Sequence, residues 1–503
     1  MYRWIKDILL PPFKGGMGWV FFLFLISVCA CDDYDTWTTS PSALLTLSED
    51  TIAFDTLITD EGSTTKTLIA SNKGDKGLRI RRVALGQGKE SLFHVNVDGQ
   101  YLYNGVGEDF EVRRKDSIYV RIEVRLPISD SDSIHAYQDE LQFTLESGAT
   151  QKVLLTASGM DVVILRGEVI TTDRTLDATR PYQVFDSLVV AQGATLTLPE
   201  GCTLMFHDGT SLLVHGSLKA MGTLERPVIL RGDRVDKMFP YLPYDNTPNR
   251  WGGLHFFGES RDNFLRQCDI HSGDYGIICD STDVSEGAQP ILTMENCIVH
   301  NIGGPGMQLW NTMTQVVGTQ ISNTLGNSVD ILGGDHLFVH CTIAQYYPLS
   351  ADRGAALQVN DAITIDASKE IYDYHHLQRA HFLNCVITGY ADDVFFGLFT
   401  PNTRDEANFL FRNCLMRTPY DDDYRFQQVT FDNPDSLEVS GEKHFRLLDT
   451  YNFIYDFAPD SLSVIRGMAD AEVARQYPVD RRGVNRLADG QPDAGAYEGV
   501  YKE

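Results

Sequence analysis

Carboxylates and one arginine in the second half of the chain are of the types that polysaccharide chemistry uses. A polysaccharide lyase needs carboxylates around a cation that neutralises the uronate, and a nearby arginine or lysine that takes the α-proton. The residues of these types are Asp330, Asp335, Asp352 and Arg353, with Asp392 and Asp393 further along. Their spacing follows no tight period, so we interpret them as solvated loop residues of an acidic protein rather than as a catalytic cluster.

Two adjacent histidines, His375 and His376, are the other residues that suggest chemistry. Neighbouring side chains on a strand point to opposite faces, so this pair is poorly placed to share a metal ion. The preceding residues 372–374 are aromatic and acidic. We interpret the stretch as an aromatic-rich loop that packs on the protein, and we expect no metal site.

Exposed aromatic residues could bind sugars without chemistry. Such binding needs a groove, aromatic faces that stack on sugar rings, and polar groups beside them. The candidate ligand-binding residues are Tyr241, Tyr244, Trp310, Tyr346 and Tyr347. The alternative is that these rings only hold their loops against the protein surface.

The elements that must position these residues are short repeats. One six-residue phrase recurs at 265–270, 294–299, 338–343, 382–387 and 411–416, each time with cysteine in fourth place. The five cysteines are 29, 44, 44 and 29 residues apart, which indicates a unit of about 22 residues with loops. Glycines between Gly193 and Gly222 likewise separate short apolar strands, three to a circuit. About ten to twelve coils, each rising ~4.8 Å, would form a parallel β-helix.

The cysteines of the phrase are better explained by packing than by metal binding or disulfides. Equivalent positions in adjacent coils are offset by ~4.8 Å with parallel side chains, whereas a disulfide prefers a Cβ separation of about 3.8 Å. Cysteine is also among the residues most often buried. We therefore expect an interior ladder of free cysteines.

The segment 44–161 has a different pattern, in which apolar and polar residues alternate. The run 118–126 alternates strictly, and turn-forming clusters separate it from similar runs. A segment of about 120 residues with this pattern suits an antiparallel β-sandwich.

The first thirty residues have the layout of a secretory signal. A basic leader precedes the uncharged apolar run 17–30, which is shorter than the roughly 20 residues that span a bilayer. The run stops at Cys31, and acidic residues follow. An ordinary cleaved signal or a membrane-anchoring helix is the alternative to lipidation at Cys31.

The overall charge excludes one class of partner. Against 42 Lys and Arg stand 69 Asp and Glu, a formal net charge of −27, which repels phosphate backbones over most of the surface. We therefore expect no nucleic-acid partner.

The chain resembles the right-handed parallel β-helix repeat surface lipoproteins of the Bacteroides group. The segments that carry the resemblance are the lipobox-like 28–31, the Hydin-like immunoglobulin-type 54–56, 118–120 and 153–159, the rungs 196–230, the stretch 250–254 and the cysteine phrases. The endings 480–486 and 492–498 look like the D-x-x-G-x-x-R and D-x-G-A-Y-E ending of such proteins. The resemblance implies lipidation at Cys31, a place on the outer face of the outer membrane, and a terminal segment that caps the last coil.

These observations give the following expectations. The fold is all-β, with a signal peptide at 1–30, an acidic tether at 31–43, the sandwich at 44–161, the β-helix at 162–445 and the cap at 446–503. The protein binds carbohydrate or another surface ligand without chemistry. The alternatives are a polysaccharide lyase or glycosidase and a structural adhesin that binds protein. We expect no cofactor, with Ca²⁺ only for the lyase.

Overall fold

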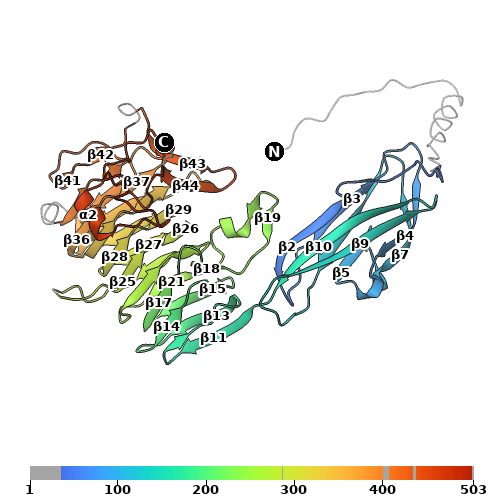
Figure 1. The fold of residues 1–503 in the computed structure, drawn as a ribbon, viewed down its shortest axis with the longest axis horizontal. Coiled ribbons are helices and arrows are strands. Elements are labelled where there is room, and N and C mark those ends of the chain that lie inside the picture. Colours follow the sequence, from blue (N-terminus) through green and yellow to red (C-terminus); the bar gives the residue numbers. More distant parts are fainter. Residues whose placement is uncertain (1–35, 286, 400–406, 434–437, 501–503) are drawn as a thin grey trace, which may run out of the picture. The chain divides into compact units, whose positions relative to one another are not determined.

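The computed structural model describes residues 36–285, 287–399, 407–433 and 438–500. The chain divides into two compact units (Figure 1). The first contains the described residues up to Phe54, with Gly62–Arg125 and Gln138–Thr156, and the second contains Asp55–Glu61, Leu126–Tyr137 and the rest of the chain from Ala157. Cys31 and the segment 1–30 lie outside the described residues. Within the described ranges, no helix is long and apolar enough to cross a membrane.

The first unit consists of two five-stranded sheets. One sheet has the order β1 (Thr46–Leu47), β3 (Lys66–Ser71), β8 (Ser117–Val124), β5 (Phe93–Val97), β6 (Gln100–Tyr101), and the other has the order β2 (Thr51–Ile58), β10 (Thr150–Met160), β9 (His135–Leu145), β4 (Leu78–Leu85), β7 (Val106–Val112). Buried and exposed side chains alternate along β8, as the sequence predicts. The rings of Phe54 and Phe93, one from each sheet, lie 6.1 Å apart, so the core lies between the sheets. This arrangement confirms the predicted antiparallel sandwich.

The second unit is a parallel β-helix whose coils have three faces. The chain enters it through β11 (Val163–Ile170) and β13 (Tyr182–Val190), which pair in parallel. The first face is a ten-stranded sheet made of β12 (Arg174–Thr175), β14 (Thr195–Leu198), β17 (Ser217–Met221), β22 (Asn263–Arg266), β25 (Leu292–Glu295), β28 (Met313–Val317), β31 (Gly334–Val339), β36 (Leu377–Leu383), β39 (Phe409–Arg412) and β41 (Phe426–Gln427). The prediction of a parallel β-helix is confirmed.

Two further ladders of parallel strands, which join in one sheet, form the other faces. The second face contains β15 (Thr203–Phe206), β18 (Val228–Gly232), β23 (Cys268–His271), β26 (Ile298–Ile302), β29 (Gln320–Thr324), β32 (Thr342–Gln345), β37 (Val386–Gly389), β40 (Leu415–Met416) and β42 (Thr430–Phe431). The third face contains β16 (Ser211–Val214), β21 (Gly253–Phe256), β24 (Ile277–Cys279), β27 (Met307–Trp310), β30 (Val329–Leu332), β33 (Leu357–Asn360) and β38 (Phe395–Leu398).

The recurring Asn-Cys phrase forms the corner between the first and second faces. The residue before the cysteine has a positive φ in every repeat, including Asn296 (56°), Asn384 (55°) and Asn413 (51°). Asparagine tolerates this left-handed conformation better than most residues with a side chain. The repeated asparagine therefore turns the chain sharply, and the cysteine that follows it points into the coil.

The interior of the β-helix is filled by rows of identical or similar side chains. Phe338, Phe382 and Phe411 are fully buried, and their rings stack with centroids 4.9 and 5.0 Å apart. The seven cysteines among the described residues are free and buried, as expected from the spacing. Burial raises the pKa of the Cys202 thiol to about 12, so this sulfur stays protonated and unreactive.

The C-terminal segment covers the side of the β-helix as well as its late coils, which corrects the expected end cap. The segment contains the hairpin β43 (Phe445–Asp449) and β44 (Ile454–Pro459), and the short helix α2 (Ala471–Gln476). Ala496 N–H donates to Thr342 Oγ1 at 2.9 Å, and Tyr497 donates to Gln320 at 2.5 Å. Both acceptors lie on the second face, several coils before the end of the ladder. This side cover buries apolar residues of the second face that water would otherwise reach.

Two hairpins extend from the coils of this unit. β19 (Lys237–Phe239) and β20 (Leu242–Pro243) form a small hairpin in the loop 234–250. β34 (Ala362–Asp366) and β35 (Ile371–Tyr374) form another, which contains the aromatic stretch before His375. Both hairpins interrupt the coils without breaking the ladders on either side.

Candidate functional site

Two of the predicted ligand-binding residues are buried and cannot offer a ring face to a ligand. Tyr346 is 1% exposed and Tyr347 is 5% exposed. The ring of Tyr346 packs against Phe445 and Phe457, and its hydroxyl lies 3.0 Å from Thr388 Oγ1. The expectation of exposed rings at both tyrosines is therefore wrong, and for Tyr346 the cause is the C-terminal segment that packs on it.

Tyr244 and Tyr241 lie in the loop 234–250 but in different surroundings. The guanidinium of Arg234 lies 3.9 Å from the Tyr244 ring centroid, and that of Arg250 lies 5.3 Å from it. These cation–π contacts use ring surface that a sugar would need. Tyr241 is exposed, and its ring stacks between Phe239 at 5.7 Å and Tyr451 at 6.4 Å. Tyr241 stays 57% exposed beside these neighbours, but unlike Trp310 and Phe396 its ring stacks on other rings.

Trp310 lies at the end of β27 on the third face and is 44% exposed. Beside it, equivalent outward positions of four successive strands form a line that we call the outer row: Gln308, Asp330, Gln358 and Phe396. Phe396 is 52% exposed, and among the described residues neither its ring nor that of Trp310 stacks on another ring. The outer row therefore ends in the free ring of Phe396, carries amide and carboxyl groups along the rest of its length, and has the ring of Trp310 beside its Gln308 end.

Asp330 is the ionisable member of the outer row. It is half-buried between the two glutamines, and within the described part of the chain no hydrogen bond or ion pair reaches its carboxyl. Burial raises the pKa of Asp330 to about 6, because the charged form loses water without gaining a partner. A carboxyl in this state is available to a ligand as an acceptor or, when protonated, as a donor.

A pocket of about 550 Å³ adjoins the outer row at Phe396. Tyr390, Arg353 and Asp393 line it together with Phe396. Arg353 lies over the Tyr390 ring at 4.6 Å and donates to the carbonyl of Tyr347 at 2.9 Å, which fixes the guanidinium. Asp393 accepts from Thr418 Oγ1 at 2.7 Å. The pocket thus presents a fixed cation, a fixed carboxylate and the rings of Tyr390 and Phe396.

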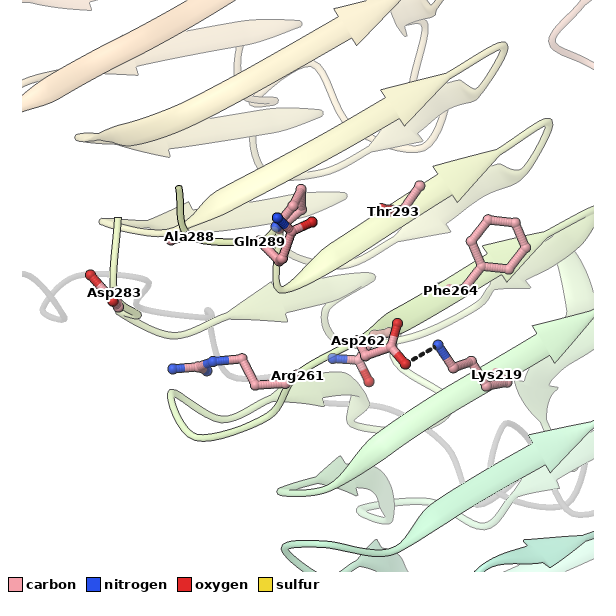
Figure 2. Close-up of a pocket in the computed structure, with 10 residues that line it drawn as sticks. Lys219, Arg261, Asp262, Phe264, Asp283, Ala288, Gln289 and Thr293 are labelled. Carbon is pink, nitrogen blue, oxygen red and sulfur yellow. Dashed lines mark ion pairs between the residues drawn. The ribbon is translucent and has the colours of Figure 1, made fainter. Parts of the chain in front are cut away.

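A second pocket, of about 570 Å³, lies on the first face (Figure 2). Lys219 and Asp262 point toward each other and form an ion pair at 2.6 Å, and Arg261 and Asp283 lie toward one end. The strongest charges here neutralise each other, and Phe264 is the only aromatic residue in the lining. This pocket suits a sugar less well than the outer row.

The carboxylates considered for lyase chemistry are spread over the unit. Asp330 is on the third face, whereas Asp335 is on the first face and pairs with Arg379 at 2.5 Å. Asp392 pairs with Arg417 at 2.8 Å. Of the six residues named from the sequence, the third-face pocket brings together only Arg353 and Asp393.

The second face holds a group of residues that could hold a metal ion, and the sequence prediction missed it. The ligand atoms of Asp269, His271 and His300 all lie within 4.8 Å of one another. Burial alone would raise the pKa of Asp269, but the charges and hydrogen bonds of the two histidines hold it well below its usual value. The signal was present in the repeated phrase, because both histidines stand three residues after a phrase cysteine, Cys268 and Cys297.

Comparison with known proteins supports the fold. Residues 167–286 match the family model of the pectate-lyase-like β-helix domain. No curated protein matches the chain. Solved structures that match locally include a family 123 glycoside hydrolase from Clostridium perfringens that hydrolyses glycolipid glycans (6% identity, 23% of this chain and 25% of that one) and a protein of unknown function from Porphyromonas gingivalis W83 (14%, 27% and 60%), both with a TM-score of 0.17.

The N-terminal domain of PorA also matches, at 15% identity over 22% of this chain and 87% of that one, again with a TM-score of 0.17. The chain spans a quarter of the first of these structures and 60% of the second. Scores this low show no shared architecture. The parallel pairing of the strands and the family model both indicate a parallel β-helix. Residues 167–286 are similar to the pectate-lyase-like β-helix domain.

Proposed function

We propose that the protein binds carbohydrate on the third face of its β-helix, along the outer row and into the adjoining pocket, while a lipid on Cys31 anchors it to the outer face of the outer membrane. The observation that carries the binding proposal is a pair of free, exposed rings along a row of polar side chains: Phe396 ends the outer row, and Trp310 lies beside Gln308 at its other end. The similarity of residues 167–286 to a pectate-lyase-like domain supports a sugar as the ligand.

The register of the coils suits an extended ligand. Trp310 and Phe396 lie on strands three coils apart, so at ~4.8 Å per coil the row extends over about 14 Å. Aromatic faces bind the apolar faces of sugar rings, and the amides and carboxyl between them bind hydroxyl groups. Arg353 in the pocket would favour a glycan that carries a carboxylate, because a fixed guanidinium pairs well with such a group.

Replacing Phe396 or Trp310 by alanine is expected to weaken glycan binding about tenfold or more, equivalent to ~1.4 kcal/mol. A glycan array with the full-length protein in detergent identifies the ligand, and calorimetry on the best glycan measures the change. Tyr241→Ala is the matched control, since Tyr241 is equally exposed but lies off the third face. Loss of binding in Tyr241→Ala with none in Phe396→Ala would move the site to the loop 234–250. Absence of any glycan ligand would leave the protein-binding adhesin.

Catalysis is the second candidate, and the raised pKa of Asp330, about 6, is the observation that favours it. A carboxyl that is partly protonated near neutral pH can act as a general acid on a glycosidic oxygen. Turnover assays on uronate-containing polysaccharides, with and without Ca²⁺, separate the two functions. Product release that Asp330→Asn abolishes would make the protein an enzyme, and binding without turnover supports the first proposal.

Lipidation is tested by Cys31→Ala, which is expected to move the protein from the membrane fraction to the soluble fraction. Several acyl chains on one residue, at ~0.8 kcal/mol per buried CH₂, hold a protein at a membrane almost permanently. Fractionation after a high-salt wash measures the change, and Cys29→Ala is the control. If Cys31→Ala stays in the membrane fraction, the anchor is not at this residue.

A further inference from the structure

The second face carries a chain of hydrogen-bonded charges that the proposed sugar site does not use. Asp269 Oδ1 lies 2.9 Å from His271 Nδ1 and 3.0 Å from His300 Nε2. On its other side, His271 Nε2 lies 2.7 Å from Asp245 Oδ1, and the guanidinium of Arg231 lies 3.0 Å from the same oxygen.

The fold places these residues by register. Asp269 and His271 are two positions apart on β23, so both point outward, and His300 on β26 is the direct partner of His271 one coil further on. Asp245 comes from outside the ladders, from the loop 234–250, which folds back over the second face. Two successive coils and one loop therefore converge on one point.

We propose that Asp269, His271 and His300 bind a divalent transition-metal ion of the zinc type, with Asp269 Oδ1, His271 Nδ1 and His300 Nε2 as ligands. Two imidazoles and one carboxylate are a donor set that zinc accepts. Ligand atoms around a tetrahedral ion with bonds of ~2.0–2.1 Å lie about 3.3–3.4 Å apart. The two Asp269–histidine separations of 2.9 and 3.0 Å open to that value with shifts of a few tenths of an ångström, and the two histidine nitrogens, which lie within 4.8 Å of each other, move closer together around the ion.

The surroundings of the three ligands match those of bound metal in other proteins. A metal-binding histidine usually donates its second ring N–H to a carboxylate, which fixes the ring and its tautomer. Asp245 holds His271 in this way, and Arg231 in turn holds Asp245. His271 is nearly buried, whereas the side chains of His300 and Asp269 are 23% and 27% exposed, so an ion has a route to the site.

The site leaves one side open. Three protein ligands around a tetrahedral ion leave a fourth position for water or for an oxygen of a ligand. The C-terminal segment covers the next coils of the same face, where Tyr497 bonds to Gln320. Gln320 stands in register with Ile298, which is itself the partner of Asp269. Asp269 therefore lies two coils before Gln320, at which this segment contacts the second face.

The test uses the full-length protein in detergent, stripped with a chelator and titrated with Zn²⁺ alone. We expect one ion per chain by elemental analysis and calorimetry, and a rise in melting temperature when Zn²⁺ is added. His300→Ala should weaken binding by more than about 100-fold, and Asp245→Asn by about 10–100-fold, because Asp245 acts through His271. His255→Ala is the matched control, since His255 is also partly exposed and lies 3.0 Å from Asp280.

The outcomes separate the metal site from a purely structural ion-pair network. A wild-type protein that binds no Zn²⁺ would overturn the proposal, and so would unchanged binding in His300→Ala. Because His300 is partly exposed, its variant should fold, and circular dichroism checks this. The glycan-binding proposal is unaffected by either result, since the outer row lies on another face.

Discussion

Asp480→Ala is expected to lower the free energy of unfolding of the second unit by about 3–5 kcal/mol. Asp480 is fully buried in the C-terminal segment. Its carboxylate accepts from the backbone N–H groups of Arg482 at 2.8 Å, Val484 at 2.7 Å and Glu498 at 2.8 Å. Alanine leaves these three donors without their acceptor, and the N–H of Glu498 is fully buried.

The same substitution removes the carboxylate that favours the charge on Arg486. Arg486 is 1% exposed, and burial lowers its pKa while the nearby Asp480 and Glu498 oppose the effect. An uncompensated buried cation adds to the cost. The hydrogen bond between Asp480 and the N–H of Glu498 also joins the stretch 480–486 to the stretch 492–498. Loss of Asp480 should therefore loosen the whole side cover.

Guanidinium denaturation followed by circular dichroism measures the loss, and hydrogen exchange of residues 480–500 locates it. Asp489→Ala is the matched control, because Asp489 is exposed and accepts one local bond from the N–H of Gln491 at 2.9 Å. We expect Asp489→Ala to change stability by less than about 0.5 kcal/mol. Equal denaturation midpoints for the two variants would contradict this account of Asp480.

Phe382→Ala is expected to destabilise the β-helix by about 3–5 kcal/mol, because it opens a cavity in the middle of the interior aromatic row. The Phe382 ring is fully buried between Phe338 and Phe411, with centroid distances of 4.9 and 5.0 Å and interplanar angles of 16°. The neighbouring rings belong to adjacent coils, whose backbone ladders restrict their movement. The cavity can therefore close only in part.

Comparing substitutions of different volume at position 382 tests whether the loss of stability follows the size of the cavity. Phe382→Leu should cost less than Phe382→Ala, since leucine fills most of the space. Phe239→Ala is the exposed control and should stay within about 0.5 kcal/mol of the parent protein. A Phe382→Ala variant that unfolds at the same denaturant concentration as Phe239→Ala would show that the row contributes little.

The fold was predictable from the sequence because successive coils of a β-helix place the same requirements on backbone conformation and side-chain size. In each of the five phrases the corner between the first and second faces takes a residue at positive φ, which is asparagine in three of them, and the buried position that follows is cysteine in all five. The alternation along 118–126 likewise predicted the sandwich strand β8. Requirements that repeat along the structure select residue types that repeat along the sequence, and such repeats can be recognised from the sequence alone.

The candidate sites were only partly predictable, because exposure depends on segments that are distant in sequence. Trp310 is exposed, whereas Tyr346 and Tyr347 are buried, and the residues that cover Tyr346 come from a segment about a hundred residues later. Phe396 and Asp330 lie in one row because their strands pair in register with the strand between them. The loops that separate these strands differ in length, so the spacing in the sequence does not show the alignment.

The sequence by itself determined the two kinds of β-architecture, the interior cysteine ladder and the acidic charge balance, since each follows from local pattern or composition. The tertiary structure decided which side chains meet. It brought Asp245 from a loop to His271, placed His300 directly beside His271 one coil further on, and laid the C-terminal ending along the second face. Such contacts depend on the length and conformation of the loops between the strands. Local sequence patterns do not specify either.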